Sequence, residues 1–314
     1  MTPSGGDHQA GRASAAETAG PSSAGDAAGT LYVVATPIGN LGDVTLRALE
    51  ILRAVPLIAA EDTRHTHRLL DRHGVSTRMT SYHARSTAAK TTALLDHLRN
   101  GADLALVTDA GTPGVSDPGS ELVAAWAAEG GVVVPVPGAS AVLAAVVGSG
   151  VAGPRWSFEG FLPRSGRDRR ERLARIAADE RGTVIYEAPG RVASTLADLA
   201  AVCGVDRPAA VCRELTKLHE SIVRATLGDL TEMARSGAIP ARGEFALVVG
   251  ARVHAPAPRS SEEGAAALVD ARVEVDRLIA GGASRSEAAR RVAATTGLPR
   301  RSLYAPPADD RMSK

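Results

Sequence analysis

The densest group of residues suited to ligand binding lies in the loop Asp109–Gly119. This loop holds three glycines, two prolines and two aspartates, and it directly follows the apolar run Leu104–Val107. Such a run predicts a strand buried on both faces, so Asp109 would lie at its carboxyl end, where open α/β sheets bind ligands. Glycines there let backbone N–H and C=O groups approach a small molecule closely. We therefore expect a ligand-binding loop, with Asp117 capping the helix that follows.

A second group of chemically active residues follows the apolar run Leu57–Ala60. Glu61 and Asp62 could orient or deprotonate a substrate hydroxyl, and Arg64 could hold a phosphate. The same residues also fit a capped helix start with an exposed ion pair, and their spacing alone favours neither reading. His83, after a further predicted strand, is a candidate for polar substrate contacts.

Metal binding is not expected. His65 and His67 are two residues apart, which points them to different faces of a helix, and no carboxylate spacing completes a ligand set.

Two further glycine loops lead out of predicted strands. They are Thr36–Asp43, after the first apolar run, and Val136–Ser140. Loops that follow parallel strands share one edge of the sheet, so three such loops predict a pocket for a small molecule.

The second half of the chain opens with an arginine-rich loop and helix. Its arginines are Arg164, Arg167, Arg169, Arg170, Arg172, Arg175 and Arg181. Arginine suits the bidentate recognition of phosphate, so this segment could contact a nucleic acid backbone. A solvated helix face crossed by i,i+4 ion pairs is the alternative.

The elements that must position these residues form an α/β chain. Strand, loop and helix alternate from Leu31 to Val147, which predicts a mainly parallel sheet with helices on both faces. Adjacent strands late in the second half predict a mixed sheet there. The expected organisation is a disordered tail (1–29), an N-terminal α/β lobe (30–150), a C-terminal α/β lobe (151–252), a linker (253–263) and a small helical RNA-binding or assembly domain (264–314).

Composition narrows the class of protein. The 314 residues carry a net charge of +1 and only two cysteines, so neither a strong global field nor a disulfide framework is expected. No segment is apolar and long enough to span a membrane. We expect a cytoplasmic protein with reduced thiols.

Five motifs together resemble the tetrapyrrole methylase superfamily, whose members bind S-adenosylmethionine in a cleft between two α/β lobes. The motifs are Ala35–Asp43, Ala60–Arg64, the Asp109–Gly119 loop, Arg213–Glu220 and Arg242–Val248. The similarity runs from about Leu31 to Gly250 and is strongest to the branch that methylates a cytidine 2'-hydroxyl in 16S ribosomal RNA. Thr296–Arg300, with Leu303 and Tyr304, resembles that branch's small extra domain. Tetrapyrrole-modifying members instead carry a glycine-rich loop with a Gly-Asp-Pro motif where this chain has Pro37–Asp43.

The resemblance implies a two-lobed fold with a helical C-terminal appendage, and it implies roles for particular residues. The cofactor would contact Pro37, Asp109, Ala110, Gly111, Pro113, Ser116, Pro137, Ala139, Ser140, Tyr186, Leu215, Glu244 and Ala246. Glu61, Asp62 and His83 are the candidates for the catalytic base or its orienting group. Arg64, Arg164, Arg167 and Arg170 would hold the RNA.

The implied cofactor is S-adenosylmethionine, and the implied partners are 16S rRNA or the small ribosomal subunit and a second copy of the chain. Two other functions remain compatible with the sequence. One is a methyltransferase acting on a tetrapyrrole or a protein side chain, and the other is a noncatalytic RNA-binding protein.

Overall fold

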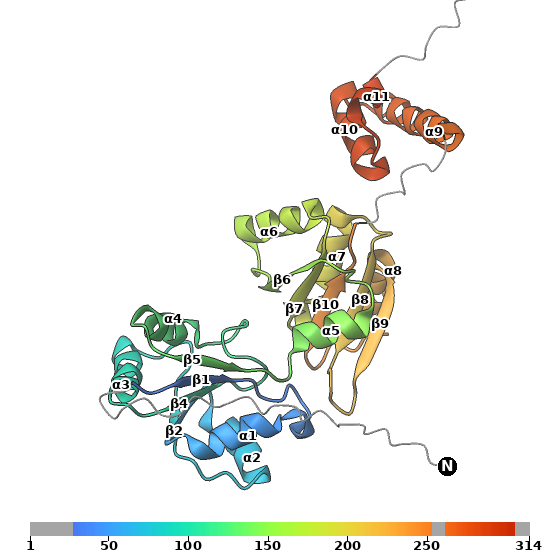
Figure 1. The fold of residues 1–314 in the computed structure, drawn as a ribbon. Coiled ribbons are helices and arrows are strands. Elements are labelled where there is room, and N and C mark those ends of the chain that lie inside the picture. Colours follow the sequence, from blue (N-terminus) through green and yellow to red (C-terminus); the bar gives the residue numbers. More distant parts are fainter. Residues whose placement is uncertain (1–27, 253–260, 305–314) are drawn as a thin grey trace, which may run out of the picture. The chain divides into compact units, whose positions relative to one another are not determined.

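The computed structural model describes residues 28–252 and 261–304, and the expected tail and most of the expected linker lie outside these ranges. The chain forms two compact units (Figure 1). One comprises the chain up to Thr36 together with Val44–Gly138, and the other comprises Pro37–Asp43 together with the chain from Ala139 onward.

The first unit is built on a five-stranded parallel sheet in the order β3-β2-β4-β1-β5. Its strands are β1 (Leu31–Val34), β2 (Leu57–Ala60), β3 (Met79–Ser81), β4 (Leu104–Val107) and β5 (Val133–Val136). Its helices are α1 (Leu46–Ala54), α2 (Thr63–Arg72), α3 (Ala88–Arg99) and α4 (Ser120–Ala128). Figure 1 shows α3 and α4 on one side of the sheet and α1 and α2 on the other.

The central strand β4 is buried on both faces, as its apolar run predicts. Leu104 and Leu106 join a core cluster with residues of α3 and α4, whereas Ala105 and Val107 join a second cluster with residues of α1 and α2. This division follows from the twofold period of a strand, whose successive side chains point to opposite faces. Because the five strands are parallel, their carboxyl ends lie at one edge of the sheet.

The second unit contains a mixed five-stranded sheet in the order β6-β7-β10-β8-β9. Its strands are β6 (Trp156–Phe161), β7 (Gly182–Glu187), β8 (Pro208–Arg213), β9 (Ser221–Thr226) and β10 (Phe245–Val249). Only β6 and β7 pair in parallel; the other neighbours are antiparallel. The helices are α5 (Ala141–Ser149), α6 (Gly166–Ala178), α7 (Val192–Cys203) and α8 (Leu227–Arg235), with short 3-10 turns at Leu41–Asp43 and Pro189–Arg191. The main core lies between the sheet and α6, α7 and α8, and α5 packs on β8 and β10.

The C-terminal helices α9 (Ser261–Ala280), α10 (Arg285–Thr296) and α11 (Arg300–Tyr304) enclose a small core of their own that includes Val275, Val292 and Leu303. Ser284 caps α10, because its Oγ accepts a hydrogen bond from Glu287 N at 3.3 Å. The α/β class, the parallel and mixed sheets and the helical appendage are confirmed. No helix within the described ranges is both long and apolar enough to cross a bilayer.

One local expectation is wrong. The helix α4 does not begin at Asp117 but at Ser120, with Gly119 at its N-cap and no side-chain cap. Gly119 has a φ of 127°, which is incompatible with helix, and a Cβ there would lie 2.7 Å from Leu106 Cδ2.

A buried arginine ties α6 to α7. Arg169 is only 7% exposed, and its guanidinium donates to Asp198 Oδ2 (2.7 and 2.9 Å), to Thr195 Oγ1 (3.0 Å) and to Pro163 O (2.9 Å). Thr195 Oγ1 in turn donates to Glu187 Oε2 at 2.6 Å. Arg169 is therefore a structural residue rather than part of an exposed basic face.

We expect Arg169→Met to lower the free energy of unfolding by about 1–3 kcal/mol, because it leaves buried acceptors without their donor. Urea denaturation measures this. Arg170→Met, on the exposed side of the same helix, is the control and should change the value by less than about 0.5 kcal/mol. Equal effects of the two substitutions would contradict the structural role of Arg169.

Candidate active site

The ends of β2 and β4 bring three predicted site residues together. Asp62 N donates to Asp109 Oδ1 at 3.0 Å, and Asp109 N donates to Glu61 Oε2 at 3.3 Å. The two strands pair in parallel up to Ala60 and Val107, so their first loop residues meet at one edge. Each strand end is thus held by a carboxylate of the other.

A fourth carboxylate joins this group. Burial, followed by the charges of Glu61 and Asp109, raises the pKa of Asp117 to about 7. Burial also raises the pKa of Glu61, aided by the charges of Asp109 and Asp62. Three close, partly buried carboxyl groups favour either a shared proton or a bound cation. We call Glu61, Asp109 and Asp117 the carboxylate cluster.

Asp62 has a different environment from Glu61. Its Oδ1 accepts hydrogen bonds from Arg64 N (2.9 Å) and Arg64 Nε (3.1 Å), and its Oδ2 accepts one from Arg64 Nη2 (2.7 Å). Asp62 is therefore the N-cap of α2, paired with an exposed arginine, as in the structural reading that the sequence left open. The hydrogen bonds from Arg64 hold the pKa of Asp62 well below its usual range, which makes this carboxylate a weak proton acceptor.

His83 is exposed and lies at the start of a short turn. Its backbone N donates to Ser86 Oγ at 2.9 Å, and its Nδ1 accepts from Arg85 N at 3.2 Å. It is close enough to Glu61 for its charge to oppose the rise in the pKa of that residue. This places His83 beside the carboxylate cluster.

The glycine loop is tied to the end of β1. Thr36 N donates to Gly111 O at 2.8 Å, and Gly111 N donates back to Thr36 O at 3.0 Å. Four loop positions adopt left-handed backbone conformations, namely Gly111, Gly114, Ser116 and Gly119. Ser116 is the unusual one, since a side chain is strained at its φ of 64°. The loop therefore has the irregular, close-approach backbone that its glycines predict.

The predicted cofactor residues divide between the two units. Six belong to the first unit: Asp109, Ala110, Gly111, Pro113, Ser116 and Pro137. Seven belong to the second: Pro37, Ala139, Ser140, Tyr186, Leu215, Glu244 and Ala246. Ser140 is the N-cap of α5 and accepts from Leu143 N at 3.4 Å.

In the second unit the structure brings several of these residues together. Tyr186 and Ala246 are direct partners in the β7–β10 ladder. The ring of Tyr186 packs against Phe158 and Phe161, with centroid distances of 4.9 and 5.7 Å. Leu215 is buried in the loop after β8.

Lys217 is a residue of this region that the sequence reasoning did not select. Its Nζ lies 2.9 Å from both Glu214 Oε1 and Glu244 Oε2. Burial alone would lower the pKa of Lys217, but its hydrogen bonds to the two glutamates outweigh that effect and raise it. The sequence feature that could have pointed to Lys217 is its position within the Arg213–Glu220 motif.

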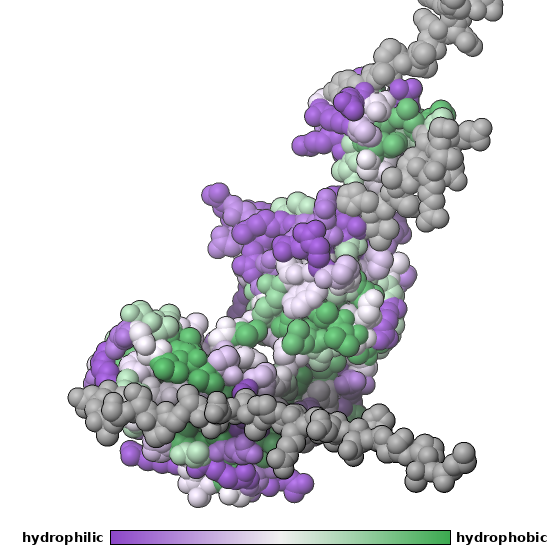
Figure 2. All heavy atoms as spheres, viewed as in Figure 1, coloured by the Kyte–Doolittle hydropathy of each residue, from purple (hydrophilic) through white to green (hydrophobic). Residues whose placement is uncertain are grey.

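The arginine-rich segment is less uniformly basic than its sequence indicates. Arg167 pairs with Glu171 (2.6 Å) and Arg172 with Glu159 (2.6 Å), and Arg181 pairs with Asp179 (2.8 Å). Arg164 and Arg170 are exposed, and neither forms an ion pair within the described part of the chain. Figure 2 shows the hydrophilic surface over α6.

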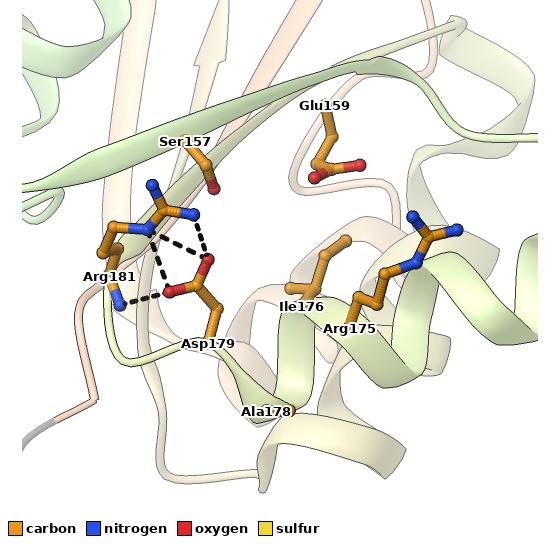
Figure 3. A pocket seen from close by; sticks show the side chains of 7 residues that line it. All are labelled: Ser157, Glu159, Arg175, Ile176, Ala178, Asp179 and Arg181. Carbon is orange, nitrogen blue, oxygen red and sulfur yellow. Dashed lines mark hydrogen bonds and ion pairs between the residues drawn. The ribbon is translucent and has the colours of Figure 1, made fainter.

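A pocket of about 480 Å³ lies between β6, the end of α6 and the start of β7 (Figure 3). Its lining residues are Ser157, Glu159, Arg175, Ile176, Ala178, Asp179 and Arg181. Its acidic and basic side chains balance, and none of the predicted site residues lines it. The pocket therefore adds nothing to the predicted cofactor site.

Comparison with known proteins identifies the family. The family model of the tetrapyrrole (corrin/porphyrin) methylases matches residues 30–231. Ribosomal RNA small subunit methyltransferase I of Synechocystis sp. is 48% identical over 88% of this chain and 96% of its own length. The protein of the same name from Bacillus subtilis is 38% identical over 88% of this chain and 93% of its length. The chain belongs to the tetrapyrrole methylases, in the branch of ribosomal RNA small subunit methyltransferase I.

Solved structures agree with the fold of this methyltransferase. Cobalt precorrin-4 methyltransferase matches with a TM-score of 0.55 at 20% identity, over 70% of this chain and 94% of that one. Uroporphyrin-III C-methyltransferase from Thermus thermophilus, solved with S-adenosyl homocysteine, matches with a TM-score of 0.52 at 20% identity, over 71% and 97% of the two chains. At this identity the likeness supports the fold alone.

In the described parts of this methylase, no group of three or more His, Cys, Asp or Glu side chains is arranged to hold a metal ion.

The carboxylate cluster should make stability depend on pH. Because the pKa of Asp117 is raised to about 7 from 3.8, the folded state binds more protons than the unfolded state between these values. The contribution that protonated Asp117 makes to the free energy of unfolding is therefore complete below about pH 4. It is lost as the pH rises through 7. We expect the urea midpoint of the wild type to fall between pH 5 and pH 8, and Asp117→Asn to reduce that fall. Asp168→Asn, at an exposed position of α6, is the control and should leave this fall of the midpoint unchanged. If the midpoint of Asp117→Asn fell as much as that of the wild type, the raised pKa of Asp117 would be contradicted.

Proposed function

We propose that this methylase transfers a methyl group from S-adenosylmethionine to the ribose 2'-hydroxyl of a cytidine in 16S rRNA. The observation that carries the proposal is the 48% identity to a ribosomal RNA small subunit methyltransferase I along 96% of that protein's length. The fold does not choose the acceptor, because structures of similar fold include a precorrin methyltransferase and a diphthine synthase. Sequence identity across 88% of this chain favours RNA over a tetrapyrrole or a protein.

The residues of the first unit fit the cofactor. S-adenosylmethionine carries a positively charged sulfonium. The partly buried carboxyl groups of the carboxylate cluster would attract this charge. The left-handed loop beside it, from Gly111 to Gly119, gives the backbone access that a close-fitting ligand needs. When bound, S-adenosylmethionine supplies a methyl group that is already electrophilic, so the protein must contribute alignment and a proton acceptor.

Among the three candidates for that proton acceptor, we favour Glu61. Burial raises its pKa, which makes it a stronger base than a free carboxylate, and its Oε2 is held by Asp109 N at 3.3 Å. Asp62 is engaged as a helix cap and an ion pair. We assign Asp62 to orienting Arg64, and His83 to polar contacts with the substrate.

The RNA would lie on the exposed arginines. Arg164 and Arg170 are exposed and without an acidic partner within the described residues, and Arg64 and Arg167 are exposed but ion-paired. A phosphate can displace a surface ion pair, since such a pair contributes only about 0–1 kcal/mol. The helices α10 and α11 add exposed arginines at Arg290 and Arg301, which supports an RNA-binding or assembly role for the C-terminal appendage.

We further propose that the protein works in the cytoplasm as a homodimer. The helix α5 exposes Leu143 and Val147, which are 54% and 81% exposed. They lie one helical turn apart on one face, and Figure 2 shows a hydrophobic surface at α5. An apolar helix face of this kind supports burial against a second copy.

The test is direct. Purified protein is incubated with tritiated S-adenosylmethionine and small ribosomal subunits from a strain that lacks this gene, and the label is mapped by nuclease digestion. We expect label on the ribose of one cytidine of 16S rRNA. Binding of S-adenosylmethionine without any labelled RNA would overturn the proposed acceptor and point to a tetrapyrrole or a protein. RNA binding without cofactor binding would point to a noncatalytic protein.

The assignment of the base makes a second prediction. Glu61→Gln should lower kcat by about 10²–10⁴-fold at saturating S-adenosylmethionine, because the amide cannot accept the hydroxyl proton. Asp62→Asn, which retains the side-chain oxygen that caps α2, is the matched control and should retain kcat within about tenfold. Single-turnover methyl transfer measures both. The reverse order of effects would make Asp62 the base and Glu61 a structural residue.

A further inference from the structure

We propose that Lys217 is a positioning residue of the cofactor site, which holds Pro37–Asp43 and the start of β10 against the loop that contains Leu215. The inference rests on the proposed function, because it assigns Lys217 to the site that binds S-adenosylmethionine. All of these residues belong to the second unit.

The ammonium group of Lys217 closes a ring of polar contacts between the end of β8 and the start of β10. It lies 2.9 Å from Glu214 Oε1 and 2.9 Å from Glu244 Oε2. Glu214 Oε1 also accepts from Glu244 N at 2.9 Å, and Glu214 N donates to Glu244 O at 2.9 Å. Glu244 is a predicted cofactor residue, so this ring fixes its backbone.

The aliphatic part of the Lys217 side chain packs on a third segment. A Cβ added to Gly39 would lie 2.4 Å from Lys217 Cγ and 2.9 Å from Lys217 Cε. Only glycine lets the lysine side chain lie this close to the backbone. Gly39 is two residues from Pro37, another predicted cofactor residue, so one side chain contacts three segments that are far apart in the sequence.

The backbone around Leu215 is strained at the same place. Glu214 and Thr216, on either side of Leu215, have φ values of 52° and 67°. Of the residues that the structure describes, Ser116 in the predicted cofactor loop is the only other non-glycine with positive φ. Strained backbone persists where surrounding contacts enforce it, and it gathers at functional sites. Here Lys217 N donates to Glu214 O at 3.0 Å, and Thr216 N donates to Glu220 Oε2 at 2.6 Å.

The charge of Lys217, and not only its bulk, is needed for this arrangement. Within the described residues no other cation forms an ion pair with Glu214 or Glu244. Without the ammonium group, two neighbouring carboxylates would repel each other, and one of them, Glu214, has only 17% of its side chain exposed. The loop would then relax, and the predicted cofactor contacts at Leu215 and Glu244 would be displaced.

The experiment compares Lys217→Met, which keeps the length of the side chain, with Lys217→Arg, which keeps the charge. Lys90→Met, in α3 of the other unit, is the matched control. Calorimetric titration of each full-length protein with S-adenosylmethionine measures Kd without RNA. We expect Kd to rise at least tenfold in Lys217→Met, to stay within threefold in Lys217→Arg and within twofold in Lys90→Met. In the methylation assay the KM for S-adenosylmethionine should rise with Kd, while kcat at saturation stays within threefold.

Wild-type affinity for S-adenosylmethionine in Lys217→Met would overturn the inference. Equal weakening in Lys217→Met and Lys217→Arg would also overturn it, because the site would then depend on the packing of the side chain and not on its charge. If Lys217→Met does not fold, Gly39→Ala takes its place. It removes no charged group but displaces the lysine side chain, and with it the ammonium group, so it should also raise Kd. Failure of the wild type to bind S-adenosylmethionine would overturn the proposed function itself, whereas a wild type that binds beside variants that bind equally well overturns only the role of Lys217.

Discussion

The rest of the first unit depends on the burial of β4 between two layers of helices. Its four residues are all buried, with Leu104 and Leu106 facing one core and Ala105 and Val107 facing the other. A strand covered on both faces can leave the core only at its ends, so its polar residues gather where it stops. That constraint brings Asp109 beside the end of β2 and produces the carboxylate cluster.

The cluster then determines how the neighbouring residues divide their roles. Glu61 and Asp62 are adjacent in the chain, but they have opposite environments. Glu61 is partly buried among other carboxylates, and burial raises its pKa; Asp62 faces Arg64, whose hydrogen bonds lower the pKa of Asp62. Two adjacent acids with pKa values shifted in opposite directions can take different roles in one reaction. The opposite pKa shifts support Glu61 over Asp62 as the proposed base, a choice that spacing alone left open.

In the second unit, the irregular loop after β8, which contains Leu215 and Lys217, is held by polar contacts. The sheet of this unit ends at Arg213 and Phe245 in adjacent strands, and the chain beyond them keeps its shape through charge: Lys217 lies between two glutamates. Arg169 plays a comparable part for α6, where a buried guanidinium joins this helix to α7 and to the loop at Pro163. In both places a long cationic side chain donates to polar groups that apolar packing would leave without a partner.

Sequence alone determined the alternation of strands and helices in the first unit and its parallel sheet, because hydrophobic periodicity and glycine loops are local properties of the chain. It also determined the family, since the Asp109–Gly119 loop and the Arg213–Glu220 motif are long and specific. It did not separate Glu61 from Asp62, place Asp117 in the carboxylate cluster or single out Lys217. Those outcomes depend on which groups lie close in space. They therefore rest on burial and on contacts between residues 27 to 178 positions apart, which only the tertiary structure decides.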